Sequence, residues 1–285
     1  MTMTATFNET NRTSEVNFFT TGDGIQIAFR IDGDAGKPVL VLANSIATSM
    51  NMWDGQIARF TEHFRVLRYD YRGHGDSDTP VGPYSTDRMG RDVAELLDSL
   101  QMDRVHFLGL SLGGVVGQWL GIHAPERINR LILSNTSSYL GPADQWNGLI
   151  ASVLQVENLN GFADMFINNW FPSPMIESES EMVAAFHKMV LATRAEGIGG
   201  SWAAIRDMDL RRTAALISSP TLVIAGQHDT VTLPSHGELI AETVPNARLL
   251  MLPAVHLPNV EYPDVFESAV LDFLLESDGQ VEQSL

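Results

Sequence analysis

Short apolar runs alternate along this chain with segments in which apolar residues recur every three or four positions. Short continuous apolar runs are typical of strands that are covered on both faces, and a recurrence of apolar residues every three or four positions is typical of helices. We predict strands at 25–31, 38–43, 64–69, 105–108, 128–133, 221–225 and 248–252, and helices at 88–100, 114–122 and 265–275. This alternation predicts an α/β fold with a mostly parallel central sheet and helices on both faces.

The pattern changes between residues 136 and 215. Strand-like runs stop, and helical stretches rich in Trp, Phe and Met appear at 162–171 and 182–194. We therefore predict a core domain formed by 16–135 and 216–277, and an inserted helical lid at 136–215 over the carboxyl edge of the sheet, where open parallel sheets bind ligands. Extra core helices elsewhere on the domain are the alternative. Residues 1–15 and 278–285 are expected to be flexible tails.

Composition narrows the class of protein. The 285 residues, 44% of them hydrophobic, suffice for a large core. The net charge of −17 argues against nucleic acid or an anionic membrane surface as a partner. There is no cysteine, no apolar run long enough to span a bilayer and no secretory signal, so a cytoplasmic protein is expected. The oligomeric state stays open.

The segment Gly109–Gly113 lies between a predicted strand and a predicted helix. In Gly-Leu-Ser-Leu-Gly, Ser111 occupies a sharp strand-to-helix turn, where the glycines two positions away on each side avoid a clash between the two elements. The helix N-terminus places partial positive charge where negative charge develops during acyl transfer. This position favours a nucleophilic serine. A glycine-rich turn with a capping serine is the simpler alternative.

A serine nucleophile needs a histidine as base and a carboxylate that orients the histidine. Asp229 follows the strand at 221–225, and His256 follows the strand at 248–252, in the chain order expected after a nucleophile of this kind. Of the eight histidines, His74 is the serious competitor as base, but it lies in a glycine-rich turn, where we expect a structural role with local hydrogen bonds. The predicted catalytic residues are therefore Ser111, Asp229 and His256.

An oxyanion hole needs two backbone N–H donors. We expect one from Leu112, which follows the nucleophile, and one from Ser45, in the loop after the strand at 38–43. No His/Asp/Glu cluster has metal-ligand spacing and no dinucleotide fingerprint opens the fold, so neither a metal nor another cofactor is expected. The predicted chemistry is acyl transfer to water, with a small-molecule ester or lactone as the substrate.

With these motifs the chain resembles the α/β-hydrolase superfamily, and within it the 3-oxoadipate enol-lactonases of bacterial aromatic degradation. The stretches that carry the resemblance are 42–48, 52–54, 68–75, 109–114, 133–136 and 206–211. Asn44-Ser45 in place of a more usual His-Gly is a marker of that group. The resemblance implies the same triad and a substrate pocket in the lid, with Trp146 as a candidate wall of that pocket. Trp170, in the Met- and Trp-rich lid, and Ile46 are further candidate substrate-binding residues.

Two departures concern the substrate. Leu149 and Asn169 stand where related lids often carry arginines, which would pair with a substrate carboxylate. A neutral or hydrophobic ester or lactone is therefore an alternative to an anionic enol-lactone, unless Arg206 or Arg211 replaces the missing arginines. A carbon–carbon bond hydrolase, a perhydrolase and a ligand receptor on the same fold also remain open.

Overall fold

The computed structural model describes residues 14–276, which form an eight-stranded sheet with helices on both faces. The sheet order is β1-β2-β4-β3-β5-β6-β7-β8. The two N-terminal strands pair antiparallel and the other six run parallel, which confirms the predicted architecture. The strands are β1 (Asn17–Thr20), β2 (Gln26–Asp32), β3 (Val39–Ala43), β4 (Arg65–Tyr69), β5 (Val105–Leu110), β6 (Ile128–Ser134), β7 (Thr221–Gly226) and β8 (Arg248–Leu252).

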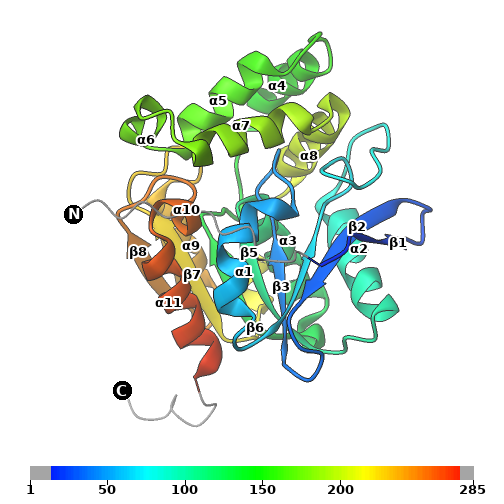
Figure 1. Cartoon of the computed structure of the whole chain (residues 1–285), viewed down its shortest axis with the longest axis vertical. Coiled ribbons are helices and arrows are strands. Elements are labelled where there is room, and N and C mark those ends of the chain that lie inside the picture. The colour runs from blue at the N-terminus through cyan, green and yellow to red at the C-terminus, as the bar shows by residue number, and fades with distance from the viewer. Residues whose placement is uncertain (1–13, 277–285) are drawn as a thin grey trace.

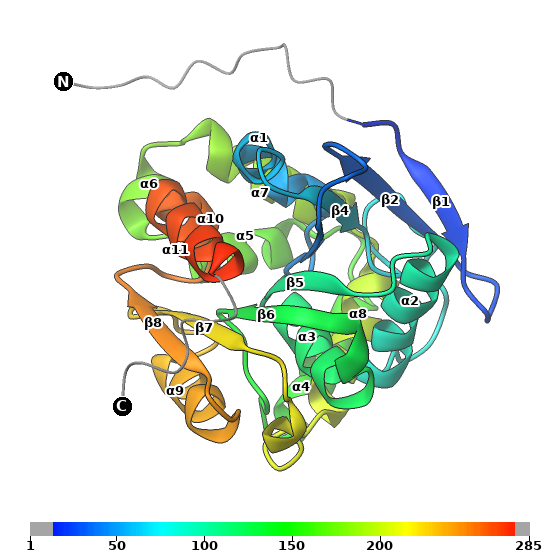
Figure 2. The same cartoon turned by 90° about the horizontal axis from the view of Figure 1, so that it is seen from below.

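Helices α1 and α11 cover one face of the sheet, and α2, α3 and α9 cover the other (Figure 2). Five further helices, α4 to α8, lie between β6 and β7 in the sequence. The bounds are α1 (Asp54–Phe60), α2 (Thr86–Ser99), α3 (Leu112–His123), α4 (Asp144–Val153), α5 (Asn160–Trp170), α6 (Ser173–Glu177), α7 (Glu181–Ala192), α8 (Ala195–Asp207), α9 (Pro234–Thr243), α10 (Pro258–Glu261) and α11 (Pro263–Leu275), with 3-10 turns η1 (Met50–Trp53), η2 (Pro125–Arg127) and η3 (Ala214–Leu216).

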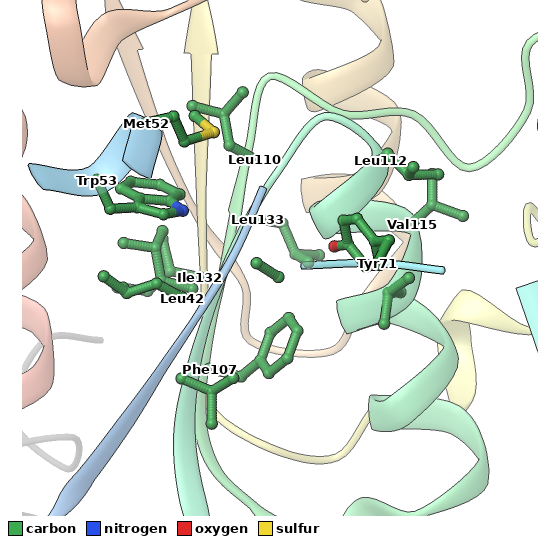
Figure 3. Packing of buried hydrophobic residues seen from close by; sticks show 14 of the residues in the cluster. Leu42, Met52, Trp53, Tyr71, Phe107, Leu110, Leu112, Val115, Ile132 and Leu133 are labelled. Carbon is green, nitrogen blue, oxygen red and sulfur yellow. The ribbon is translucent and has the colours of Figure 1, made fainter. Parts of the chain in front are cut away.

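The core follows the apolar pattern of the sequence. Strands β5 and β7 are buried along their whole length, as continuous apolar strands under two helical layers must be. Figure 3 shows Met52 and Trp53 on one side of the central strands and Leu112 and Val115 of α3 on the other. Helix α2 buries a single stripe that includes Met89, Val93 and Leu96, and the Ser85 side chain caps its N-terminus.

Helices α4–α8 lie together above the carboxyl ends of the parallel strands, at the top of Figure 1. Helices α5 and α7 occupy the two stretches where helices were predicted. We call α4–α8 the helical insertion. The predicted tails, apart from Ser14 and Glu15, lie outside the described residues. Within residues 14–276 no helix combines the length and apolar character needed to cross a bilayer.

Candidate functional site

Ser111 occupies the turn between β5 and α3 in a strained backbone conformation, with φ +58°. Gly109 and Gly113 allow this turn. A Cβ at Gly109 would overlap the carbonyl of Gly113, and a Cβ at Gly113 would overlap the carbonyl of Ala43. The Ser111 N–H donates to the Ser134 carbonyl of β6 at 2.9 Å, and its side chain caps no helix N–H. The serine is therefore fixed through its backbone, while its hydroxyl makes no capping bond.

The Asp229 carboxylate lies three residues beyond β7 and is 2% exposed. Its Oδ1 accepts the backbone N–H groups of Val231 (2.8 Å) and Thr232 (3.0 Å). Its Oδ2 accepts Thr232 Oγ1 at 2.7 Å and Asn135 Nδ2 at 2.9 Å. Burial by itself would raise the pKa of Asp229, but His256 and the hydrogen bonds from Asn135 and Thr232 hold that pKa below its ordinary value. The carboxylate is thus ionised at neutral pH.

The His256 ring is 1% exposed and lies beside this carboxylate, with Nδ1 at 2.7 Å from Asp229 Oδ2. The backbone N–H of His256 donates to the Trp170 carbonyl at 3.4 Å, so the end of α5 contacts the histidine loop directly. The structure therefore joins Asp229 and His256, which lie 27 residues apart in the sequence. Within residues 14–276 neither Ser111 Oγ nor His256 Nε2 makes a hydrogen bond, so the structure does not link the serine to the pair by one.

The loop after β3 offers two backbone N–H groups close to this edge. The Ser45 N–H donates to Met52 Sδ at 3.2 Å, so the donor predicted for the oxyanion hole already has an acceptor in this conformation. The Ile46 N–H has no acceptor among the described residues, and neither has the Leu112 N–H at the start of α3. Sulfur is a weak acceptor, yet its contact with Ser45 makes Ile46 the better candidate.

His74 has the structural role that the sequence predicted. Its Nε2 accepts the Ala47 N–H at 2.9 Å, and its Nδ1 lies 3.3 Å from the Arg72 carbonyl. Burial lowers the pKa of His74 to about 4, so the ring is neutral at physiological pH. The imidazole supports the loop that contains Ile46 and is not positioned as a competing base.

The candidate substrate-binding residues differ in their surroundings. Trp170 is buried in the helical insertion with its ring tilted against that of Phe166, and it contacts the His256 loop through its carbonyl. Ile46 is buried after β3. Trp146 lines a cleft of about 430 Å³ whose lining includes neither Ser111 nor His256. That lining is Tyr139, Leu140, Gly141, Gln145, Trp146, Thr230, Val231, Leu233 and His236.

Sequence reasoning missed Asn135 and Thr232 as partners of Asp229. Asn135 directly follows β6 and belongs to a stretch that carried the family resemblance, and Thr232 lies in the loop after β7 at the same sheet edge. That position is the signal that could have identified them. Within the described part of the chain, no three His, Asp or Glu side chains lie close enough together to hold a metal ion.

The fold and the strand–serine–helix turn define the class of this protein. A family model described as "alpha/beta hydrolase fold" matches residues 38–263, and the chain belongs to the α/β-hydrolase family. It is similar to 3-oxoadipate enol-lactonase 2 of Acinetobacter baylyi, at 39% identity over 88% of this chain and 93% of that protein. The resemblance to enol-lactonases predicted from the sequence is thereby confirmed.

Two crystal structures are also similar to this chain. A hydrolase from Pseudomonas aeruginosa PA01 has a TM-score of 0.91 and 56% identity, covering 94% of this chain and all (100%) of that one. The enol-lactonase from Burkholderia xenovorans LB400 has a TM-score of 0.88 and 36% identity, covering 91% and 100% of the two chains. These relatives are hydrolases, which supports hydrolase as the class of enzyme.

Proposed function

We propose that this protein is a cofactor-free serine hydrolase that cleaves a carboxylic ester or lactone. Ser111 is the nucleophile, His256 the base and Asp229 the residue that orients and stabilises the imidazole. The observation that carries the proposal is the 2.7 Å contact between His256 Nδ1 and Asp229 Oδ2. This contact fixes the proton of the neutral ring on Nδ1 and leaves Nε2 as a basic atom at the sheet edge where Ser111 follows β5.

In the first half-reaction, Ser111 Oγ bonds to the carbonyl carbon as its proton passes to His256 Nε2. The N–H groups of Leu112 and Ile46 stabilise the negative oxygen that results. The bond to the leaving oxygen then breaks, and His256 returns its proton to that oxygen. Water attacks the acyl-enzyme with His256 again as base, releases the acid and restores Ser111. In a lactone the leaving alcohol remains attached to the acyl group.

The helical insertion is proposed to act as a lid that excludes water from this reaction. The hydrogen bond from His256 N to the Trp170 carbonyl supports this role because it connects α5 to the loop of the base. Closure over a site strengthens the electrostatic interactions inside it. We assign residues 136–215 to this lid and the flanking segments 16–135 and 216–277 to the core.

An uncharged ester or lactone is the favoured substrate. Arg206 and Arg211, the two arginines considered as partners for an anionic substrate, are each paired with a neighbouring carboxylate, Asp207 at 2.7 Å and Asp209 at 2.6 Å. The anionic enol-lactone is the second candidate, which the identity with the Acinetobacter baylyi enol-lactonase favours.

A fluorophosphonate probe tests the proposed nucleophile. Intact-mass spectrometry should show one covalent adduct on the wild type, mapped to Ser111 by peptide analysis, and none on Ser111→Ala. The Ser111→Ala variant should also lose all but a few per cent of the activity on aryl esters. An adduct at another residue, or an active Ser111→Ala variant, would remove Ser111 from the role. A panel of lactones and esters with and without a carboxylate, followed by acid release, separates the two substrate candidates.

A further inference from the structure

Asn135 lies at the carboxyl end of β6 and links the loop of the acid to the loop of the base. Its side chain is 1% exposed, and its backbone adopts φ +42°, a left-handed conformation that asparagine tolerates better than most residues. Its backbone N–H donates to the Ile224 carbonyl of β7 at 2.8 Å. The backbone is therefore anchored to the sheet, and the position of the amide follows from it.

Every polar atom of the Asn135 amide has a partner. Nδ2 donates to Asp229 Oδ2 and to the Val255 carbonyl, both at 2.9 Å. Oδ1 accepts from Ser134 Oγ at 3.1 Å. These three contacts fix the orientation of the amide, because a flipped amide would place its oxygen against a carboxylate oxygen and a carbonyl oxygen.

The two acceptors of Nδ2 belong to two different loops. Asp229 follows β7, and Val255 immediately precedes His256 after β8. Gly226 allows the loops to approach, because a Cβ there would overlap the Val255 carbonyl and crowd Asn135 Nδ2. A single rigid amide thus sets the relative position of the acid and of the peptide bond that carries the base.

We propose that Asn135 is a positioning residue of the hydrolase: it holds Asp229 and the His256 loop as one unit so that His256 Nε2 is presented to Ser111. The inference rests on the proposed function. It also makes Asn135 part of the polar surroundings of the pair, because loss of its donor leaves more negative charge on the carboxylate beside the imidazole.

Kinetics of two Asn135 variants test the proposal. Asn135→Gly keeps the left-handed backbone and removes the amide, whereas Asn135→Asp keeps the shape and replaces both Nδ2 donors. In each variant kcat on a neutral aryl ester should fall about 10- to 100-fold while KM changes less than about threefold. The acid limb of the pH–kcat profile should move to higher pH, further in Asn135→Asp than in Asn135→Gly, because the surroundings of the pair become more negative.

Thr232→Val is the matched comparison. It removes the other side-chain donor to Asp229 Oδ2 without touching the Val255 carbonyl. If Asn135 acts as a bridge, Thr232→Val should lower kcat several-fold less than Asn135→Gly. Equal losses in the two variants would reduce Asn135 to one donor among several and overturn the bridging role.

Folded and active protein is counted in every sample by thermal denaturation and by titration with the fluorophosphonate probe. Losses of kcat that match the loss of folded protein, with an unshifted acid limb, would overturn the proposal. If Asn135→Gly does not fold, the kcat and the acid limb of Asn135→Asp alone test the positioning role. A wild type that the probe labels at Ser111, combined with wild-type behaviour of the Asn135 variants, refutes the positioning role only. A wild type without labelling at Ser111 refutes the proposed function itself.

Discussion

The backbone N–H of Ala47 donates a hydrogen bond to Nε2 of His74 at 2.9 Å, and this contact holds the loop of the candidate oxyanion donor Ile46. Ala47 has φ +57°, a conformation that costs free energy for a residue with a Cβ and persists only where the surroundings impose it. The imidazole can accept this bond only while Nε2 carries no proton. The geometry of the loop is therefore linked to the protonation state of a buried histidine.

His74 should titrate in NMR spectra with a midpoint near the pKa of about 4 that its burial gives it. Its folded pKa is depressed below the unfolded value of about 6.5, so the unfolded state binds the additional proton between these values, and the contribution of His74 to stability is lost as pH falls through that window. Burial raises the pKa of Asp70 to about 6, so Asp70 changes the free energy of unfolding with pH in the opposite direction to His74. A measurement of stability alone would mix the two effects, and the His74 ring is therefore observed directly by NMR. A His74 midpoint near 6.5 would contradict the buried, neutral ring.

Gly113→Ala should lower the free energy of unfolding by about 1–3 kcal/mol or more, because the new methyl group would overlap the Ala43 carbonyl. Urea denaturation measures this change. Gly148→Ala is the control: position 148 lies inside α4 with no atom within 4 Å of the added Cβ. That substitution should stabilise the protein slightly, by up to about 1 kcal/mol. Equal effects at the two positions would contradict the close approach of α3 to β3.

Asp229→Asn should reduce kcat about 10⁴-fold, because the amide would no longer stabilise the imidazolium or fix its tautomer. The melting temperature should fall as well, since one of two oxygens that together accept five donors would become an NH₂ group. Ester hydrolysis and a thermal scan check both effects. Asp209→Asn, in an exposed pair with Arg211, should leave both quantities at wild-type values. If the kcat of Asp229→Asn lay within tenfold of the wild-type value, this carboxylate would be excluded from the triad.

Arg72→Met should be strongly destabilising, by about 3 kcal/mol, because it removes one of the two arginines that pair with the buried Asp92 carboxylate and leaves only Arg88. Arg72 is 4% exposed and donates to both oxygens of the buried Asp92 at 2.6 and 2.7 Å. Arg91→Met breaks an exposed pair with Asp87 and should cost less than about 1 kcal/mol. Urea titrations of the two variants measure the difference. Similar losses would contradict a larger contribution of the buried Arg72–Asp92 pair to stability.

The parts of the fold that could be predicted are those whose signal is local. Apolar runs and the alternating segment at 25–31 identified seven strands, because strands buried by helices on both faces are mostly apolar. The structure adds β1 (Asn17–Thr20), which is short, lies at the sheet edge and is largely exposed, so its sequence carries little strand signal. Asp229 and His256 were predicted because parallel strands end at one edge, which brings the residues after them together.

The details of the site could not be predicted in the same way. Ser45 and Ile46 are neighbours in sequence, and the preference for Ile46 as a donor arises because Met52 Sδ accepts the Ser45 N–H. The two acceptors of the Asn135 amide lie 94 and 120 residues away in the sequence. No local pattern encodes such contacts, since they depend on how three strand ends and their loops pack.

The sequence by itself determined that Ser111 sits on a tight strand-to-helix turn, because only glycine can occupy positions 109 and 113 where two elements approach so closely. It also determined the buried parallel sheet, because burial on both faces restricts strand composition. The tertiary structure alone decided which amide orients the Asp229 carboxylate and which loop N–H remains available. A hydrogen bond between distant segments requires the donor and acceptor atoms to lie within about 3 Å of each other. The folded backbone brings such atoms together, and the spacing of residues along the chain does not predict which atoms will meet.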